Sequence, residues 1–149
     1  MKVRDIMDPS PDIIRTSDTF EHLIKILNEV KYHVVFVVDK EEKLVGIVTE
    51  GDIIKVLIPK YVAVDESLIS VMDVNYFERK CRESKNLPIN EIMSKVTFMV
   101  GEEDPIIKAA ALMVMNKIQT IPVVRNGKVV GIVPRLTLIK HITKILKCA

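Results

Sequence analysis

The chain contains two copies of one pattern, and the second copy begins about 86 residues after the first. The segment Val3–Met7 returns as Ile89–Met93, and Lys43–Val48 returns as Lys128–Val133. Between these anchors the register slips by one residue, at a polar stretch where a turn tolerates a deletion. Such a duplication predicts two small units related by a pseudo-twofold axis, with their apolar faces buried against each other and clefts left between them.

Composition limits the number of domains and the classes of partner. With 149 residues and 48% hydrophobic content, the chain can bury a substantial core, but two half-sized units must share it. We therefore expect one compact module with a first repeat at 1–60, a connector at 61–88 and a second repeat at 89–149. We interpret the 22 basic and 20 acidic residues as interspersed along the chain. The sequence contains no basic run of the kind that would indicate direct binding of nucleic acid.

Cysteine usage and hydropathy bear on the compartment. Cys81 and Cys148 are far apart, which is typical of ordinary thiols in a reducing cytoplasm and not of a disulfide framework or a metal pair. The N-terminus opens directly into charged residues, and no apolar run approaches the ~20 residues needed to span a bilayer. We expect a cytoplasmic protein without a membrane partner.

Periodicity predicts the order strand, helix, strand, strand, helix in both repeats. In the first repeat the expected strands are 13–15, 34–38 and 44–48, and the expected helices are 18–31, with a capping box that begins at Asp18, and 49–57. In the second repeat we expect a strand at 98–100, a helix capped by Asp104, a hairpin from Ile121 to Val133 around Asn126-Gly127, and a closing helix from about Leu136.

Two short motifs carry a resemblance to a known family. The first repeat contains Gly46-Ile47-Val48-Thr49-Glu50-Gly51-Asp52, and the second contains Ile121-Pro122-Val123-Val124. Together with the duplication, they resemble a pair of cystathionine-β-synthase (CBS) domains, also called a Bateman module, over about four fifths of the chain. The resemblance implies an α/β (α+β) fold of two pseudo-twofold-related β-α-β-β-α repeats packed sheet to sheet, with a helical connector. It also implies a disc-like homodimer.

The Gly46–Asp52 motif has a direct physical interpretation as well. A strand that delivers Thr49 and Asp52 to the start of a helix places a hydroxyl, a carboxylate and unpaired backbone amides at one edge of a cleft. Asp52 can accept both hydroxyls of a ribose, Thr49 and the amides can face a phosphate, and Gly51 keeps the approach open. The alternative interpretation is that Thr49 and Asp52 only cap the helix.

The resemblance implies that the opposite repeat completes this cleft. By position, the residues that would do so, with Ile47 beside the base, are Met93, Val96, Thr97, Phe98 and Gln119. Apolar walls suit a flat purine, although each apolar member of this set could equally belong to the core.

The second signature departs from the family pattern. Pro134 stands where Thr belongs and Thr137 where Asp belongs, so the related cleft lacks the ribose acceptor and one amide. We expect that site to be weak, empty or altered in specificity. By position, His33 would face this second cleft and Arg135 would lie near the mouth of the Asp52 cleft, where each could contact phosphate. Both could equally be ordinary surface residues.

The connector carries many apolar residues and then the charged stretch Glu78–Glu83, which predicts one amphipathic helix. We expect this helix to pack on the edge of the module. In the alternative, Tyr76, Phe77 and the neighbouring charges contact a second module or another protein.

The sequence offers little support for catalysis. No Ser-His-Asp or Cys-His arrangement is visible, and the three histidines lack metal-ligand spacing, so we expect no catalytic residue, no metal and no catalytic cofactor. The sequence therefore predicts a regulatory sensor for an adenosine nucleotide (AMP, ADP or ATP) or S-adenosylmethionine, which signals occupancy through repeat or dimer packing to an unidentified regulated protein. A structural dimerisation module without a ligand is the alternative. A DNA-binding regulator lacks the basic helix-turn-helix it would need.

Overall fold

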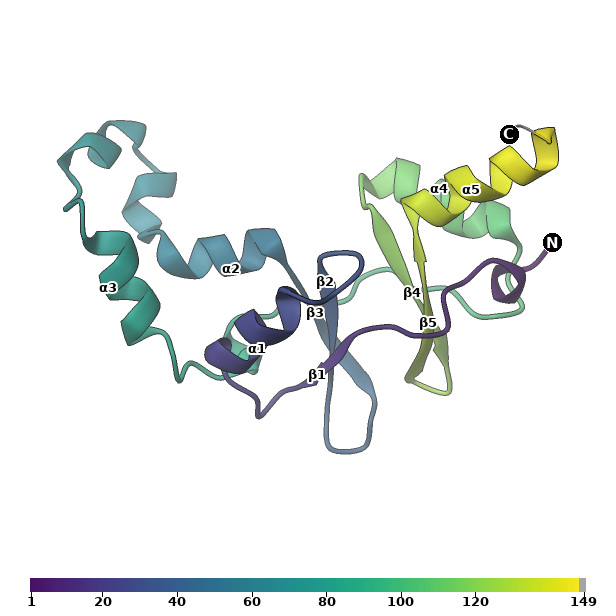
Figure 1. Cartoon of the computed structure of the whole chain (residues 1–149), viewed down its shortest axis with the longest axis horizontal. Helices are drawn as coiled ribbons and strands as arrows, with labels where there is room; N and C mark the ends of the chain where they lie inside the picture. The colour runs from purple at the N-terminus through teal and green to yellow at the C-terminus, as the bar shows by residue number, and fades with distance from the viewer. Residues whose placement is uncertain (148–149) are drawn as a thin grey trace.

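The computed structural model describes residues 1–147 and shows two α+β units joined by a helical connector (Figure 1). The first unit consists of β1 (Ile13–Arg15), α1 (Phe20–Leu27), β2 (Val34–Val38), β3 (Leu44–Thr49) and α2 (Glu50–Leu57). The second consists of α4 (Ile106–Asn116), β4 (Thr120–Arg125), β5 (Lys128–Pro134) and α5 (Arg135–Leu146). The connector contains α3 (Tyr76–Glu83), and short 3-10 turns lie at Val3–Asp5, Lys60–Ala63, Glu66–Val71 and Ile89–Glu91. Cys148 lies outside the described residues.

The two sheets differ by one strand. In the first repeat, β1 runs parallel to β2, and β2 pairs antiparallel with β3. The second repeat has only the antiparallel pair β4 and β5, so the expected strand at 98–100 is wrong and is reduced to a single bridge between Val100 and Val123. The physical reason lies in β4. Phe36 donates its amide hydrogen to the Asp12 carbonyl oxygen, at 2.9 Å, whereas the equivalent Pro122 has no amide hydrogen to extend the ladder.

The tight turn between β4 and β5 follows its sequence. Asn126 and Gly127 have φ angles of 53° and 81°, the left-handed pair that a two-residue type I′ hairpin requires. The predicted hairpin around these residues is confirmed. Helix α1 ends at Leu27, earlier than expected, because the chain tightens there: the Glu29 amide donates to the Ile26 carbonyl oxygen at 2.9 Å.

The two aspartates expected to cap helices have a different role. Asp18 and Asp104 each accept a hydrogen bond from the backbone amide three residues earlier, Arg15 at 2.9 Å and Gly101 at 2.7 Å. They therefore close the turn before each helix, because a short carboxylate reaches back to its own backbone readily. The cap of α1 is Thr19, whose hydroxyl accepts from a backbone amide in the first turn.

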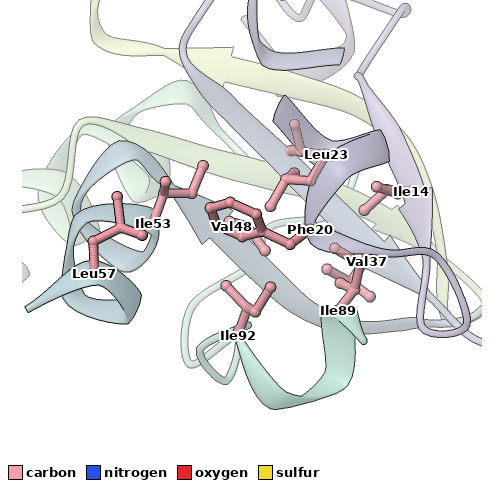
Figure 2. Packing of buried hydrophobic residues seen from close by; sticks show 10 residues of the cluster. Ile14, Phe20, Leu23, Val37, Val48, Ile53, Leu57, Ile89 and Ile92 are labelled. Carbon is pink, nitrogen blue, oxygen red and sulfur yellow. The ribbon is translucent and has the colours of Figure 1, made fainter. Parts of the chain in front are cut away.

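Each repeat completes the hydrophobic core of the other with its leading segment. The core beneath α1 and α2 includes Ile89 and Ile92, which belong in sequence to the second repeat (Figure 2). The core beneath α4 includes Val3, which belongs to the first repeat and whose amide donates to the Asp104 carbonyl oxygen at 2.8 Å. Because the leading segments are exchanged, we expect the two repeats to unfold as a single cooperative unit.

A third cluster lies where the two sheets meet. Phe36 and Ile132, from β2 and β5, are almost fully buried in it, and Val34 joins them. The sheet-to-sheet packing implied by the resemblance is confirmed. This contact also brings the end of β3 close to segments of the second repeat, which positions the cleft described below.

The connector is partly helical, as the sequence predicted. Cys81 on α3 and Leu87 after it pack against the core of the first repeat. The guanidinium of Arg79 lies 5.5 Å from the centre of the Tyr76 ring, while Phe77 remains exposed. The connector therefore covers one side of the first repeat.

Candidate functional site

A cleft of about 440 Å³ lies between the two repeats. Its walls include seven of the residues predicted to bind ligand, namely Ile47, Thr49, Gly51, Val96, Thr97, Phe98 and Gln119. Residues from the end of β3 and the start of α2 form one wall, and residues that precede α4 and β4 form the other. The structure thus brings together residues up to 72 positions apart in the sequence.

Asp52 does not line the cleft, unlike its neighbours Thr49 and Gly51, and is only 9% exposed. Its Oδ2 atom accepts hydrogen bonds from the Thr49 amide at 2.9 Å and the Thr49 hydroxyl at 3.2 Å. Its Oδ1 atom accepts one from the Ser94 hydroxyl at 2.7 Å. A carboxylate oxygen can accept two hydrogen bonds, so Oδ1 retains capacity for one further donor.

The capping interpretation of Thr49 and Asp52 is seen directly in this geometry. Thr49 is the N-cap of α2, and the two side chains exchange hydrogen bonds with each other's backbone amides as a capping box. The bond from Ser94 adds a link to the segment that leads the second repeat. The network fixes the start of α2 against the segment that leads the second repeat.

Met93 does not line the cleft, contrary to the sequence-based expectation. It packs against the core of the first repeat, directly over Gly46 in β3. A Cβ atom at Gly46 would lie 2.9 Å from the Met93 Cγ atom, so the missing side chain of this glycine is what makes room for Met93. Met93 therefore belongs to the hydrophobic core of the first repeat and not to the lining of the cleft.

His33 lies in the cleft of Thr49, and its expected position in the second cleft is wrong. Its Nδ1 atom is 3.8 Å from the Glu50 Oε2 atom, a contact that holds the imidazole beside α2. His33 also has a left-handed φ of 58°, which turns the chain just before β2. Arg135 lines an adjacent hollow, and its backbone amide donates to the Gln119 carbonyl oxygen at 2.8 Å.

Two lysines of the cleft were not predicted. Lys95 and Lys117 contribute to its second-repeat wall, while Glu50 contributes the carboxylate on the opposite wall. Lys95 immediately precedes the predicted wall residue Val96, so its place in the sequence was the available signal. Lys117 ends α4 in a left-handed conformation with φ 54°. Two ammonium groups in one cleft favour a ligand that carries negative charge.

The pseudo-symmetric position of Ser94 in the other repeat is Asp8. The backbones of Asp8 and Ile132 exchange two hydrogen bonds of 2.9 Å, as those of Ser94 and Ile47 do. The Asp8 Oδ2 atom accepts from the Tyr32 hydroxyl at 2.8 Å. Burial acts to raise the pKa of Asp8, but hydrogen bonds from the Ser10 amide and Tyr32, together with Lys31, outweigh it and hold this pKa below its ordinary value. The carboxylate in turn raises the pKa of Tyr32.

Among residues 1–147, no three His, Cys, Asp or Glu side chains are grouped as a metal site. Over the same residues, no helix has the length and apolar character that crossing a membrane requires.

Known proteins with similar sequences support one family. The CBS domain matches residues 3–59 and 89–144. The uncharacterized protein MJ1426 of Methanocaldococcus jannaschii is 27% identical, over 94% of this chain and 90% of its own length. The uncharacterized protein MJ1004 of the same organism is 30% identical over 97% of this chain, which spans only 58% of MJ1004.

Solved structures agree with this assignment. The crystal structure of MJ1004 matches with a TM-score of 0.73 and 28% identity, over 97% of this chain and 60% of the other. The CBS domain pair of protein MJ0100, in complex with 5′-methylthioadenosine and S-adenosyl-L-methionine, matches with a TM-score of 0.71 and 25% identity, over 97% of this chain and 98% of the other. The repeat pattern, the sheet-to-sheet packing and both matched segments show that the chain belongs to the CBS domain family, as a tandem CBS pair.

Proposed function

We propose that the chain is a regulatory, non-catalytic module that binds an adenosine-containing ligand in the cleft between its repeats. The observation that carries this proposal is the convergence of Thr49 and Gly51 from one repeat with Val96, Phe98 and Gln119 from the other. The CBS domain pair of MJ0100 binds two adenosine compounds, which supports the same class of ligand here. Ligand contact with both repeats is what would couple occupancy to their packing.

The cleft provides a role for each part of such a ligand. Ile47, Val96 and Phe98 would form the apolar walls around adenine, and Gln119 would add a polar contact. Asp52 would use the free acceptor capacity of Oδ1 for a ribose hydroxyl. Thr49, Thr97 and the amides near Gly51 would meet a phosphate, with His33 nearby and Arg135 at the adjacent hollow.

The charges favour a nucleotide over S-adenosylmethionine. Lys95 and Lys117 would attract the phosphates of AMP, ADP or ATP and would repel a positively charged sulfonium. The effect should grow with the number of phosphates. We therefore expect ATP and AMP to bind more tightly than uncharged adenosine, and S-adenosylmethionine to bind least tightly.

Four further statements about the protein are proposals. The boundaries 1–60, 61–88 and 89–149 are supported by the matched segments of the family. A homodimer is supported by the exposed apolar residues of α4 and α5, and the same observation favours the alternative of a structural dimerisation module without a ligand. A cytoplasmic location agrees with the free thiol of Cys81. We also propose that an unidentified protein contacts the module and is regulated by it.

Calorimetric titration of the nucleotide-free protein with ATP, AMP, adenosine and S-adenosylmethionine tests the proposal. In Asp52→Asn, which keeps the shape of the capping carboxylate, binding should weaken by about 1.5–3 kcal/mol, the range for a hydrogen bond to a charged group. In Lys95→Ala, ATP binding should weaken while adenosine binding should not change. Lys128→Ala, an exposed lysine outside the cleft, is the matched control. Absence of heat with all four compounds would favour the structural alternative.

A further inference from the structure

Charge is distributed very unevenly along the chain, contrary to the interspersed pattern inferred from the totals. Residues 105–149 hold eight lysines and arginines and no aspartate or glutamate. Residues 1–104 hold fourteen basic and twenty acidic residues. The second repeat is therefore strongly basic beyond its leading segment, and the remainder is acidic. Such asymmetry between the two halves of a chain points to an interaction with an anionic partner.

The basic half carries a large apolar groove between α4 and α5, with a volume of about 960 Å³. Large side chains of both helices line it in exposed positions: Ile107 is 71% exposed and Val114 is 80% exposed. Lys117, Arg135 and His141 also line the groove. Exposed apolar patches of this kind, rimmed by polar groups, mark contact sites for other molecules.

Part of the equivalent face of the first repeat is covered by the chain itself. Leu57 of α2, the counterpart of Ile142 in α5, is 3% exposed, whereas Ile142 is 48% exposed. Cys81 from α3 and Leu87 pack against the first-repeat core that contains Leu57. The connector therefore covers this face of the first repeat around Leu57, although Ile54 on α2 stays 51% exposed, and the corresponding part of the second-repeat face around Ile142 is open.

One segment of the connector has the properties that would complement the open groove. Residues 61–74 contain the acidic residues Asp65, Glu66 and Asp73 and no basic residue. Five of the large apolar side chains in this segment are exposed, namely Tyr61, Val64, Ile69, Val71 and Val74. An acidic segment with exposed apolar side chains matches a basic groove with exposed apolar walls in both charge and hydropathy. It cannot reach the groove of its own chain, because the connector and α5 lie at opposite ends of the molecule (Figure 1).

We propose that two copies of this chain associate antiparallel, with residues 61–74 of each copy docked in the α4/α5 groove of the other. The contact is made twice, so the assembly closes as a twofold dimer and does not grow into a filament. This proposal specifies the contact of the homodimer proposed above and rests on that part of the function alone. It does not depend on adenosine binding, because association can be measured on the nucleotide-free protein.

Charge reversal on each side of the contact provides the test. The connector variant combines Asp65→Lys with Glu66→Lys, and the groove variant combines Lys117→Glu with Arg135→Glu. Sedimentation equilibrium of the nucleotide-free protein should show a wild-type dimer, and each variant alone should dissociate about tenfold more readily or worse, because like charges then face each other in both contacts. Lys40→Glu, in the turn between β2 and β3, is the control and should leave the dimer unchanged.

An equimolar mixture of the connector and groove variants should restore the dimer. In the mixed pair, one contact joins two wild-type surfaces and the other joins two reversed surfaces, so both are complementary. Circular dichroism of each variant alone checks that its fold is kept, and restoration in the mixture checks the same point independently.

Four outcomes would overturn the proposal. These are a monomeric wild type, a mixture that stays dissociated, growth beyond the dimer with rising concentration, and a groove variant that associates more tightly than wild type. The last would indicate that two α4/α5 faces meet each other, since reversal would relieve their repulsion. If instead a monomeric protein sediments with phosphatidylserine vesicles, and the connector variant does so equally, the groove binds an anionic membrane and the proposal is wrong.

Discussion

Replacement of Ile89 by alanine tests the exchange of leading segments between the repeats. Ile89 belongs to the second repeat in sequence, but it is 0% exposed within the core of the first. Its amide also donates to the Asp18 carbonyl oxygen at 2.9 Å, so the backbone is held in place and cannot easily move to fill a cavity. The substitution removes three carbon atoms, each worth about 0.8 kcal/mol of transfer free energy, or about 2.4 kcal/mol in total.

The residual cavity adds to this loss, so the free energy of unfolding should fall by about 3 kcal/mol, within the usual range for Ile→Ala in a core. Urea denaturation followed by circular dichroism would measure it, with the m-value unchanged from wild type. Ile54→Ala is the matched control, because this isoleucine on α2 is 51% exposed and its loss should change stability by less than about 0.5 kcal/mol.

Urea denaturation of Ile89→Ala also tests whether the two repeats unfold cooperatively. Because each core contains a residue group from the other repeat, secondary structure in both repeats should be lost in one transition. A loss below about 1 kcal/mol for Ile89→Ala would refute the packing argument, since that is less than the transfer term alone. Two separate transitions would refute the interdependence of the repeats.

Three other predictions follow from the hydrogen bonds, the turn and the altered signature. Tyr32→Phe should cost about 1–2 kcal/mol at neutral pH by removing the hydrogen bond to Asp8. Because the folded pKa of Asp8 is lowered, its contribution is present above the ordinary value of 3.8 and is lost as pH falls, so the gap between Tyr32→Phe and wild type should close in acid; an unchanged gap in urea titrations would contradict this. Gly127→Ala should cost about 1 kcal/mol or more by thermal unfolding, because its φ of 81° disfavours any side chain. Pro134→Thr combined with Thr137→Asp should raise the nucleotide stoichiometry measured by calorimetry above that of wild type, and an unchanged value would count against a repairable second site.

Local signals in the sequence predicted several elements correctly. The Asn126-Gly127 pair predicted its hairpin because few other dipeptides adopt two successive left-handed conformations at low cost. The strand at Ile13–Arg15 was also predicted with its observed bounds, since it is a short β-branched run before a helix-capping sequence. The family resemblance, based on the duplication and the Gly46–Asp52 motif, was confirmed by two matched segments.

The errors arose where distant residues decide the outcome. The expected strand at 98–100 failed because Pro122, far along the chain, lacks the hydrogen that its partner needs. Met93 left the cleft because Gly46 makes room for it in the core. Lys95 was marked only by its place beside Val96, Lys117 carries no pattern that marks it as a cleft residue, and the packing of the repeats brings the two together. The ligand roles of the cleft residues remain predictions.

The exchanged leading segments also constrain how the chain folds during synthesis. The first repeat lacks part of its core until Ile92 has left the ribosome, although its own helices and strands end at Leu57. Val3 docks on a core whose last strand, β5, ends at Pro134, 131 residues further along the chain. Contacts between residues so far apart form only after a large loop has closed. Loop closure costs conformational entropy, which slows folding. The nascent repeats therefore stay open to proteases and chaperones until β5 has been synthesised, and both repeats become native together.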